Sequence, residues 1–322
     1  MKTTRYIFLL LLLISVLSCS EEDNILPEEV VLPELISGSA DFSTYVSLGN
    51  SLTAGFSDGT VFRAAQENSY PSIMAQQFAL VGGGEFTQPL VNDNFGGLAA
   101  GGNRIASPRL VTAGGPPQGI ESIIGPVTVT TDIVLNNPTG PFNNMGVPLA
   151  SSFHLLDLGI PGSGYGDING LGVYANPYFI RMASAPDATI IGDAMAQNPT
   201  FFTLWIGAND VLGYATSGGD GSRAITDQAT FDLAYDAIIS TLISGGAKGV
   251  IANVPNVESA PYFNTIPNNA LVLDAATAGQ LTGFFQAVAG IFTQVLIAQM
   301  VPPAQAQQLA AQYAITFEEG TN

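Results

Sequence analysis

The chain of 322 residues carries 26 acidic and eight basic side chains, so its formal net charge is −18 at pH 7. Such a surface repels nucleic acid and anionic lipid headgroups, which excludes proteins that bind polyanions through charge. Hydrophobic residues make up 47% of the sequence, and this content excludes an intrinsically disordered chain.

The N-terminal segment has the pattern of a secretory signal. Lys2 and Arg5 precede an apolar run over residues 6–16, which is shorter than the roughly 20 residues that span a bilayer. We expect residues 1–18 to be removed, which would leave six basic side chains against 26 acidic ones. The single cysteine, Cys19, rules out a disulfide within the chain.

Cys19 directly follows Val-Leu-Ser, and this arrangement resembles a bacterial lipobox, in which the thiol is lipidated after cleavage. The resemblance implies an outer-membrane lipoprotein on the periplasmic or cell-surface face, anchored to the membrane at Cys19. An ordinary cleavage site with a chance cysteine beside it is the alternative. Residues 19–40 are acidic and contain proline, and we interpret them as a tether that leads to a domain over residues 41–322.

The domain alternates predicted strands with predicted helices. Continuous apolar, β-prone runs predict strands over residues 42–48, 153–158, 201–206 and 247–254. Apolar periodicity and capping residues predict helices over residues 69–80, 227–244, 271–299 and 304–313. Buried strands separated by helices indicate a mostly parallel sheet covered on both faces, and therefore an α/β fold.

Two segments do not follow this alternation. Residues 81–150 are rich in Gly, Pro and Asn and show little periodicity apart from the alternating residues 127–131, and we expect an insertion of loops with a small hairpin. Residues 315–317 are β-prone and predict the start of a further strand.

Three short motifs each follow a predicted strand: GNSLTAG at 49–55, GIPGSGYGD at 159–167 and GANDVLG at 207–213. The carboxyl ends of parallel strands meet at one edge of a sheet, so these motifs should converge. They offer a hydroxyl nucleophile surrounded by hydrogen-bond donors, which is what acyl transfer requires. We predict Ser51 as the nucleophile. The predicted oxyanion donors are the backbone N–H groups of Ser51 and Gly162 and the side-chain amide of Asn209.

The same motifs resemble the three sequence blocks of the SGNH, or GDSL-type, hydrolases over roughly residues 42–260, with Asn50 where the usual form has Asp. The resemblance implies a flavodoxin-like three-layer α/β/α sandwich. It also implies an esterase or lipase that cleaves an acyl or acetyl ester through an acyl-enzyme on Ser51, with Gly162 and Asn209 completing the oxyanion hole. The implied substrate is a small ester, a lipid or an acylated glycan, and no cofactor or metal is implied.

Each motif alone has a simpler interpretation. A serine after Gly-Asn commonly caps a turn, and Asn209 with the aspartate that follows it is common in loops. The glycines at 162–166 lack both G-x-G-x-x-G and a Walker lysine, which argues against a nucleotide loop. The nucleophile elbow G-x-S-x-G is absent, because Thr53 occupies the position of its second glycine.

The general base is the open question, because His154 is the only histidine. In SGNH hydrolases the base lies in a D-x-x-H block near the C-terminus, and the sequence contains no such block. We expect His154 to be a half-buried residue inside the strand at 153–158, with a hydrogen-bonded ring nitrogen. Five residues at ~3.3 Å each would place it about 16 Å from the edge, too far from Ser51 to act as its base.

Two explanations for the absent block remain open. The printed chain stops before the block, or the protein is a pseudo-enzyme that binds a lipid or glycan ligand without chemistry. In either case we expect little or no esterase activity from residues 1–322, because the serine proton has no imidazole acceptor.

Overall fold

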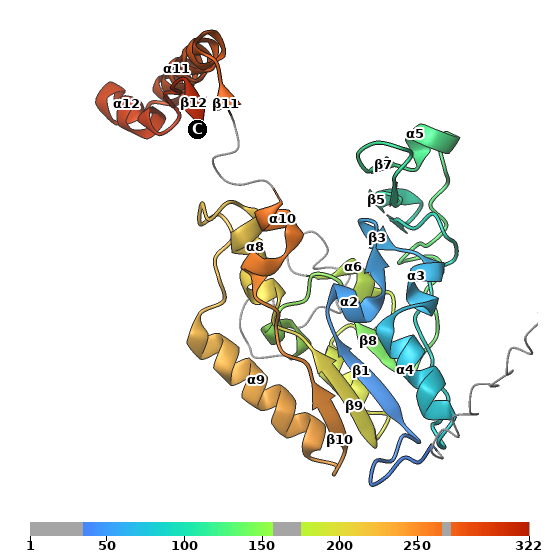
Figure 1. Cartoon of the computed structure of the whole chain (residues 1–322). Coiled ribbons are helices and arrows are strands. Elements are labelled where there is room, and N and C mark those ends of the chain that lie inside the picture. The colour runs from blue at the N-terminus through green and yellow to red at the C-terminus, as the bar shows by residue number, and fades with distance from the viewer. Residues whose placement is uncertain (1–34, 157–174, 266–271, 322) are drawn as a thin grey trace, which may run out of the picture.

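The computed structural model describes residues 35–156, 175–265 and 272–321. Its central sheet has four parallel strands in the spatial order β10-β9-β1-β8 (Figure 1). The strands are β1 (Tyr45–Gly49), β8 (Asn144–Gly146), β9 (Phe201–Trp205) and β10 (Lys248–Ile251). The predicted parallel sheet of an α/β fold is confirmed, and β1, β9 and β10 lie where strands were expected.

The strand expected over residues 153–158 is wrong in its described part. Ser152–Leu155 form a 3₁₀ turn, η1, because Ser151 and His154 form a capping box that satisfies the N–H groups of a helical turn. The second strand of the sheet is β8, which lies within residues 81–150. Its buried Asn144 donates to the Thr53 carbonyl and to Gln88 Oε1. Because those bonds offset the burial of a polar side chain, β8 has no apolar signature in the sequence.

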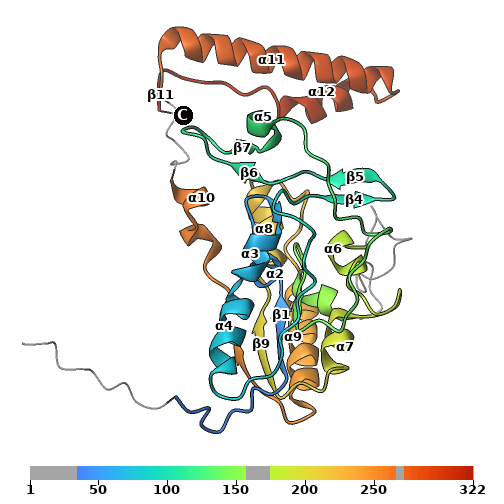
Figure 2. The same ribbon diagram turned by 90° about the vertical axis from the view of Figure 1, so that its right-hand side faces the viewer.

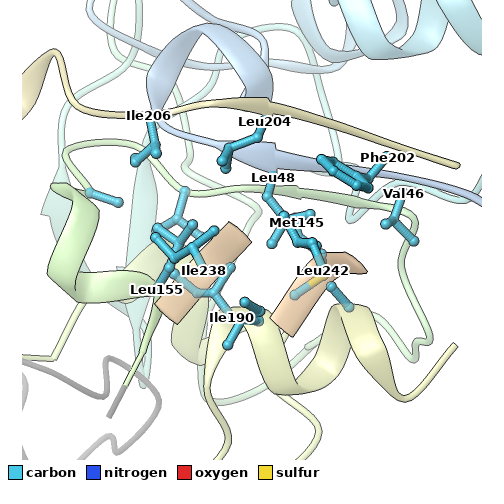
Figure 3. Packing of buried hydrophobic residues seen from close by; sticks show 14 of the residues in the cluster. Val46, Leu48, Met145, Leu155, Ile190, Phe202, Leu204, Ile206, Ile238 and Leu242 are labelled. Atoms are coloured by element: carbon cyan, nitrogen blue, oxygen red, sulfur yellow. The ribbon is translucent and has the colours of Figure 1, made fainter. Parts of the chain in front are cut away.

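Helices cover both faces of the sheet (Figure 2). On one face, α7 (Ile190–Met195) and α9 (Gln228–Ile243) pack against alternate strand residues, and Figure 3 shows this core. The fully buried side chains there include Val46, Leu48, Met145, Leu204, Ile190, Ile238 and Leu242. On the other face lies α4 (Tyr70–Ala79), whose Phe78 ring stacks on Phe42 at 3.9 Å. The sheet therefore has two buried faces, as parallel sheets do.

The predicted helices are confirmed with small changes at their ends. Helix α9 is capped by Asp227, whose side chain accepts the Thr230 N–H at 3.0 Å. Shorter helices occupy the connections: α2 (Ser51–Ala54), α3 (Arg63–Glu67), α5 (Glu121–Ile124), α6 (Pro177–Ile180), α8 (Asn209–Thr216), η3 (Val257–Ser259) and α10 (Pro261–Asn264).

The segment 81–150 contains more regular structure than expected. It has two antiparallel hairpins, β4 (Leu98–Ala100) with β5 (Asn103–Ala106) and β6 (Leu110–Val111) with β7 (Gln118–Gly119). The small hairpin expected in this segment is therefore confirmed, although the alternating residues 127–131 form no strand. A further hairpin, β2 (Phe56–Ser57) with β3 (Thr60–Val61), precedes α3.

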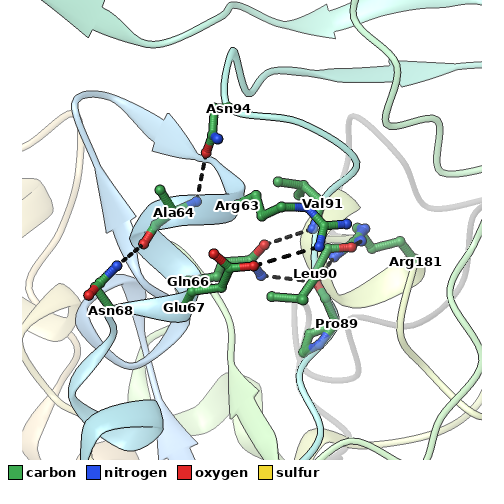
Figure 4. A network of polar contacts seen from close by, with 10 residues as sticks. All are labelled: Arg63, Ala64, Gln66, Glu67, Asn68, Pro89, Leu90, Val91, Asn94 and Arg181. Atoms are coloured by element: carbon green, nitrogen blue, oxygen red, sulfur yellow. Dashed lines mark hydrogen bonds and ion pairs between the residues drawn. The ribbon is translucent and has the colours of Figure 1, made fainter.

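Two buried side chains fasten residues 89–91 to the body of the domain (Figure 4). Gln66 donates to the Pro89 carbonyl at 2.9 Å and accepts the Val91 N–H at 2.7 Å. The Arg181 guanidinium donates to the carbonyls of Pro89 at 2.6 Å and Leu90 at 2.7 Å. Burial lowers the Arg181 pKa to about 10. These bonds hold a loop in place that has no strand or helix of its own.

The C-terminal helices α11 (Ala275–Ala298) and α12 (Pro303–Ala311) pack on each other and lie apart from the sheet (Figures 1 and 2). Both were expected. A short antiparallel pair connects the residues before α11 with those after α12: β11 (Val272–Leu273) pairs with β12 (Gly320–Thr321). The strand start expected at 315–317 is wrong, because those residues form no strand. Within the described parts of the chain, α11 is the one helix long and apolar enough to cross a membrane, with a mean hydropathy of 1.6.

Candidate active site

Ser51 is the first residue of α2, and only Asn50 separates it from the end of β1. The Asn50 side chain caps the helix by accepting the Leu52 N–H at 3.2 Å. Gly55 ends α2 with φ at +74°, a left-handed conformation that glycine adopts without strain. The GNSLTAG motif thus encodes a one-turn helix that presents Ser51, half-buried, at the carboxyl edge of the sheet.

Close approach of α2 to the sheet explains the glycines around it. A Cβ atom on Gly49 would lie 2.5 Å from the Trp205 carbonyl oxygen and would also overlap Thr53. A Cβ atom on Gly146, in β8, would lie 2.5 Å from the Thr53 carbonyl carbon. Glycine at both positions lets α2 sit directly over the ends of β1 and β8, where Figure 1 shows it.

A tight turn follows β8 and contacts the Ser51 side chain. The Ala150 N–H donates to the Val147 carbonyl at 3.1 Å, with Pro148 and Leu149 between them. Leu149 has φ at +69°, and proline followed by a left-handed residue defines a type II turn. For a residue with a Cβ atom this conformation costs about 1–2 kcal/mol. The Leu149 N–H donates to Ser51 Oγ in a long hydrogen bond of 3.4 Å.

Asn209 reaches the same turn from β9. It is the first residue of α8 and follows Gly207, whose φ is +115°. Its side-chain Nδ2 donates to the Ala150 carbonyl at 2.8 Å. Ser51 and Asn209 therefore contact two consecutive residues, Leu149 and Ala150, and the structure brings these two predicted site residues to one place. Gly162 lies outside the described residues, as does Cys19.

Asp210 secures the far end of this turn. Its carboxylate is buried and accepts both the Ser152 N–H at 2.8 Å and the Ser152 hydroxyl at 2.7 Å. The Asp210 backbone carbonyl accepts the Thr226 N–H at 2.9 Å, which connects α8 to the start of α9. The turn after β8 is thus held from both sides, by α2 through Ser51 and by α8 through Asn209 and Asp210.

His154 lies in η1, three residues beyond Ser151 and next to this turn, so the expected distance of about 16 Å along a strand does not apply. Its Nδ1 accepts the Ser151 N–H at 2.8 Å, and burial lowers the His154 pKa to about 4. The imidazole is therefore neutral at pH 7, with the proton on Nε2 and the Nδ1 lone pair engaged. In this arrangement neither nitrogen offers a lone pair to Ser51.

An apolar hollow of about 570 Å³ is lined by residues of α8 and of the first turns of α9. Its lining includes the apolar side chains of Val211, Ile225, Phe231 and Val254 together with Asp227 and Asp232. This volume falls within the range of small-molecule sites, about 300–1,000 Å³. The acidic rim favours a neutral or cationic group over an anionic one.

Leu149 and Ala150 are the site residues that the sequence motifs missed. A usable signal was present, because G-V-P-L at 146–149 has nearly the same pattern as G-I-P-G at 159–162, and the first of the two begins at the last residue of β8. The leucine hid the match, since glycine is the usual residue at the third position of a type II turn.

No protein-family model, no curated protein and no solved structure matches the chain.

Proposed function

We propose that the chain has a flavodoxin-like fold whose carboxyl edge is the nucleophile and oxyanion site of a serine ester hydrolase of SGNH type. When β1, β8, β9 and β10 are numbered 1 to 4 along the chain, their spatial order in the sheet is 2-1-3-4. This order agrees with the first four strands of the flavodoxin-like order. The strand order reverses between β1 and β9, because β8 lies on one side of β1 and β9 on the other. Ligands of open α/β sheets bind at such a reversal, and Ser51 and Asn209 follow the two strands that border it.

The observation that carries the proposal is the shared turn. The Leu149 N–H contacts Ser51 Oγ, and the next residue accepts from Asn209. A side-chain amide nitrogen has two N–H donors, so its bond to Ala150 leaves one for a developing oxyanion. The Leu149 N–H, beside the nucleophile, is a second donor to the same oxygen.

In the proposed reaction, Ser51 Oγ bonds to the ester carbonyl carbon and its proton passes to a base. The carbonyl oxygen becomes an oxyanion held by the donors around it. The C–O bond to the alcohol then breaks, the alkoxide takes up a proton, and the acyl group remains on Ser51. Water then adds to the acyl carbon and the bond from that carbon to Ser51 Oγ breaks. The acid is released, and a proton from the water restores the Ser51 hydroxyl. The chain's own residues supply the attack and the charge stabilisation.

The proposed reaction needs a general base for the Ser51 proton, and the imidazole of His154 does not serve as one because its Nδ1 accepts the Ser151 N–H. We therefore expect hydrolysis of p-nitrophenyl butyrate to be slow and to rise about 10²-fold or more when imidazole is added, because general-base catalysis contributes on that order. The rise is measured against Ser51→Ala, which reports the reaction of imidazole alone. An equal rise in both proteins would contradict Ser51 as the nucleophile.

A non-catalytic surface lipoprotein that binds a lipid or glycan is the second candidate, and the engaged state of His154 favours it. A fluorophosphonate probe separates the two. Labelling of Ser51 that Ser51→Ala abolishes supports the hydrolase. Saturable binding of a neutral lipid, with no labelling in the presence of imidazole, supports the binding protein.

We also propose that Cys19 carries the lipid that anchors the protein to the outer membrane. The acidic residues that follow Cys19 support exposure of the domain beyond the headgroups, since they are repelled by an anionic surface. Metabolic labelling with a palmitate analogue should mark the wild-type protein and not Cys19→Ala. Equal labelling of both proteins would exclude this site.

A further inference from the structure

Leu149 combines two properties that its packing does not explain. Its left-handed backbone is strained for any residue with a Cβ atom. A core residue can offset such strain by burying its side chain, but Leu149 is 64% exposed. The strain persists because the turn is held at three points: Pro148 accepts from Asn176 at 2.8 Å, Ala150 accepts from Asn209, and Ala150 donates to Val147.

The position of Leu149 points to a substrate. Its N–H contacts Ser51 Oγ, so a group bonded to Ser51 passes within reach of the leucine side chain. Leu52, on the other side of the nucleophile in sequence, is also 49% exposed. In the described part of the chain, two exposed leucine side chains therefore flank Ser51, although the chain as a whole is strongly acidic.

We infer that Leu149 is a specificity-determining residue of this site, whose side chain packs against an apolar acyl group bonded to Ser51. The inference rests on the proposed function and names its substrate class: esters of apolar acyl groups, in preference to acetyl or charged acyl esters. Burial of the exposed leucine against the acyl chain stabilises the complex, and glycine, the residue that the turn prefers, would forgo this contact.

Alkylboronic acids test the inference without a general base. Boron bonds to Ser51 Oγ and becomes tetrahedral while the serine proton passes to the buffer, and boron-11 NMR follows the change. We expect the wild-type protein to bind butylboronic acid more tightly than methylboronic acid. Leu149→Ala should reduce that preference about fivefold, the size expected for a partly buried leucine. Leu149→Met, which keeps an apolar side chain, should retain most of it.

Leu80→Ala is the matched control, because Leu80 is equally exposed at 64% but lies at the end of α4, away from Ser51. It should leave the preference unchanged. Leu149→Gly should lose the preference and melt no lower than the wild type, since glycine relieves the strain. An unchanged preference in Leu149→Ala, with the adduct still formed on Ser51, would overturn the inference alone. No tetrahedral adduct in the wild type, or one that persists in Ser51→Ala, would overturn the proposed function as well.

Discussion

One hydrogen bond determines the chemistry of the only histidine. The Ser151 N–H donates to His154 Nδ1, and burial keeps the ring neutral by lowering its pKa to about 4. Protonation would break this bond, because an imidazolium has no acceptor nitrogen. His154 thus stabilises η1, the turn that positions residues 149–152, and it does so only in its neutral form.

The free energy of unfolding should therefore depend on pH through His154. Its pKa is about 4 in the folded state and near 6.5 when unfolded, so the unfolded chain binds more protons between these values. The contribution, about 3 kcal/mol, is present above pH 6.5 and is lost as the pH falls to about 4. His154→Asn keeps an acceptor but cannot titrate. Urea unfolding of both proteins at pH 7 and pH 4 measures the difference, and a difference independent of pH would contradict this assignment.

At the scale of secondary structure, the nucleophile depends on how closely α2 approaches the sheet. The helix has four residues and cannot be stable alone, so its position comes from its contacts with β1 and β8. Gly49 and Gly146 permit these contacts, since a Cβ atom on either would overlap neighbouring atoms. Helix α2 therefore positions Ser51 precisely only while it stays in direct contact with the two strands.

Gly49→Ala should destabilise the fold by about 2–3 kcal/mol, as overpacking of a close contact does. It should also abolish labelling of Ser51, because α2 must move to admit the methyl group. Gly279→Ala is the control: it lies in α11 with no atom near the added methyl group, and alanine favours a helix. Thermal unfolding and fluorophosphonate labelling give the two readouts. A stable Gly49→Ala protein that labels normally would show that α2 is not tightly placed.

At the scale of the whole molecule, α11 leaves an apolar face uncovered. Phe284 is 61% exposed, Ile291 66% and Val295 46%, and their spacing places them on one side of the helix. The helix contains no charged residue over its 24 positions. An exposed apolar surface of this kind promotes association and binds hydrophobic dyes.

Replacing Phe284, Ile291 and Val295 together by lysine should reduce dye binding and self-association of the domain lacking residues 1–18. The sheet should keep its melting temperature, because these side chains are exposed and α11 packs on α12. Lysine at Gln280, Gln286 and Gln294, also exposed on α11, adds the same charge without removing apolar area. Equal effects of the two triple variants, measured by fluorescence and light scattering, would attribute association to charge alone.

Much of the architecture could be predicted because it rests on local patterns. The apolar runs of β1 and β9 and the periodicity of α9 and α11 each mark an element by itself. The motifs around Ser51 and Asn209 likewise predicted that a turn follows each of these strands. Strand β8 could not be recognised in this way, because Asn144 is buried through hydrogen bonds to Thr53 and Gln88, groups far away in the chain.

The amino-acid sequence by itself determined the α/β alternation, the strand that precedes Ser51 and the strand that precedes Asn209, since burial of apolar side chains leaves a periodic trace. Only the tertiary structure decided which backbone N–H faces the nucleophile and what state His154 adopts. Those outcomes depend on a strained turn after β8 that is held by the side chains of Ser51 in α2, Asn209 in α8 and His154 in η1. Such a turn exists only once separate segments have packed together, so no single stretch of sequence encodes it.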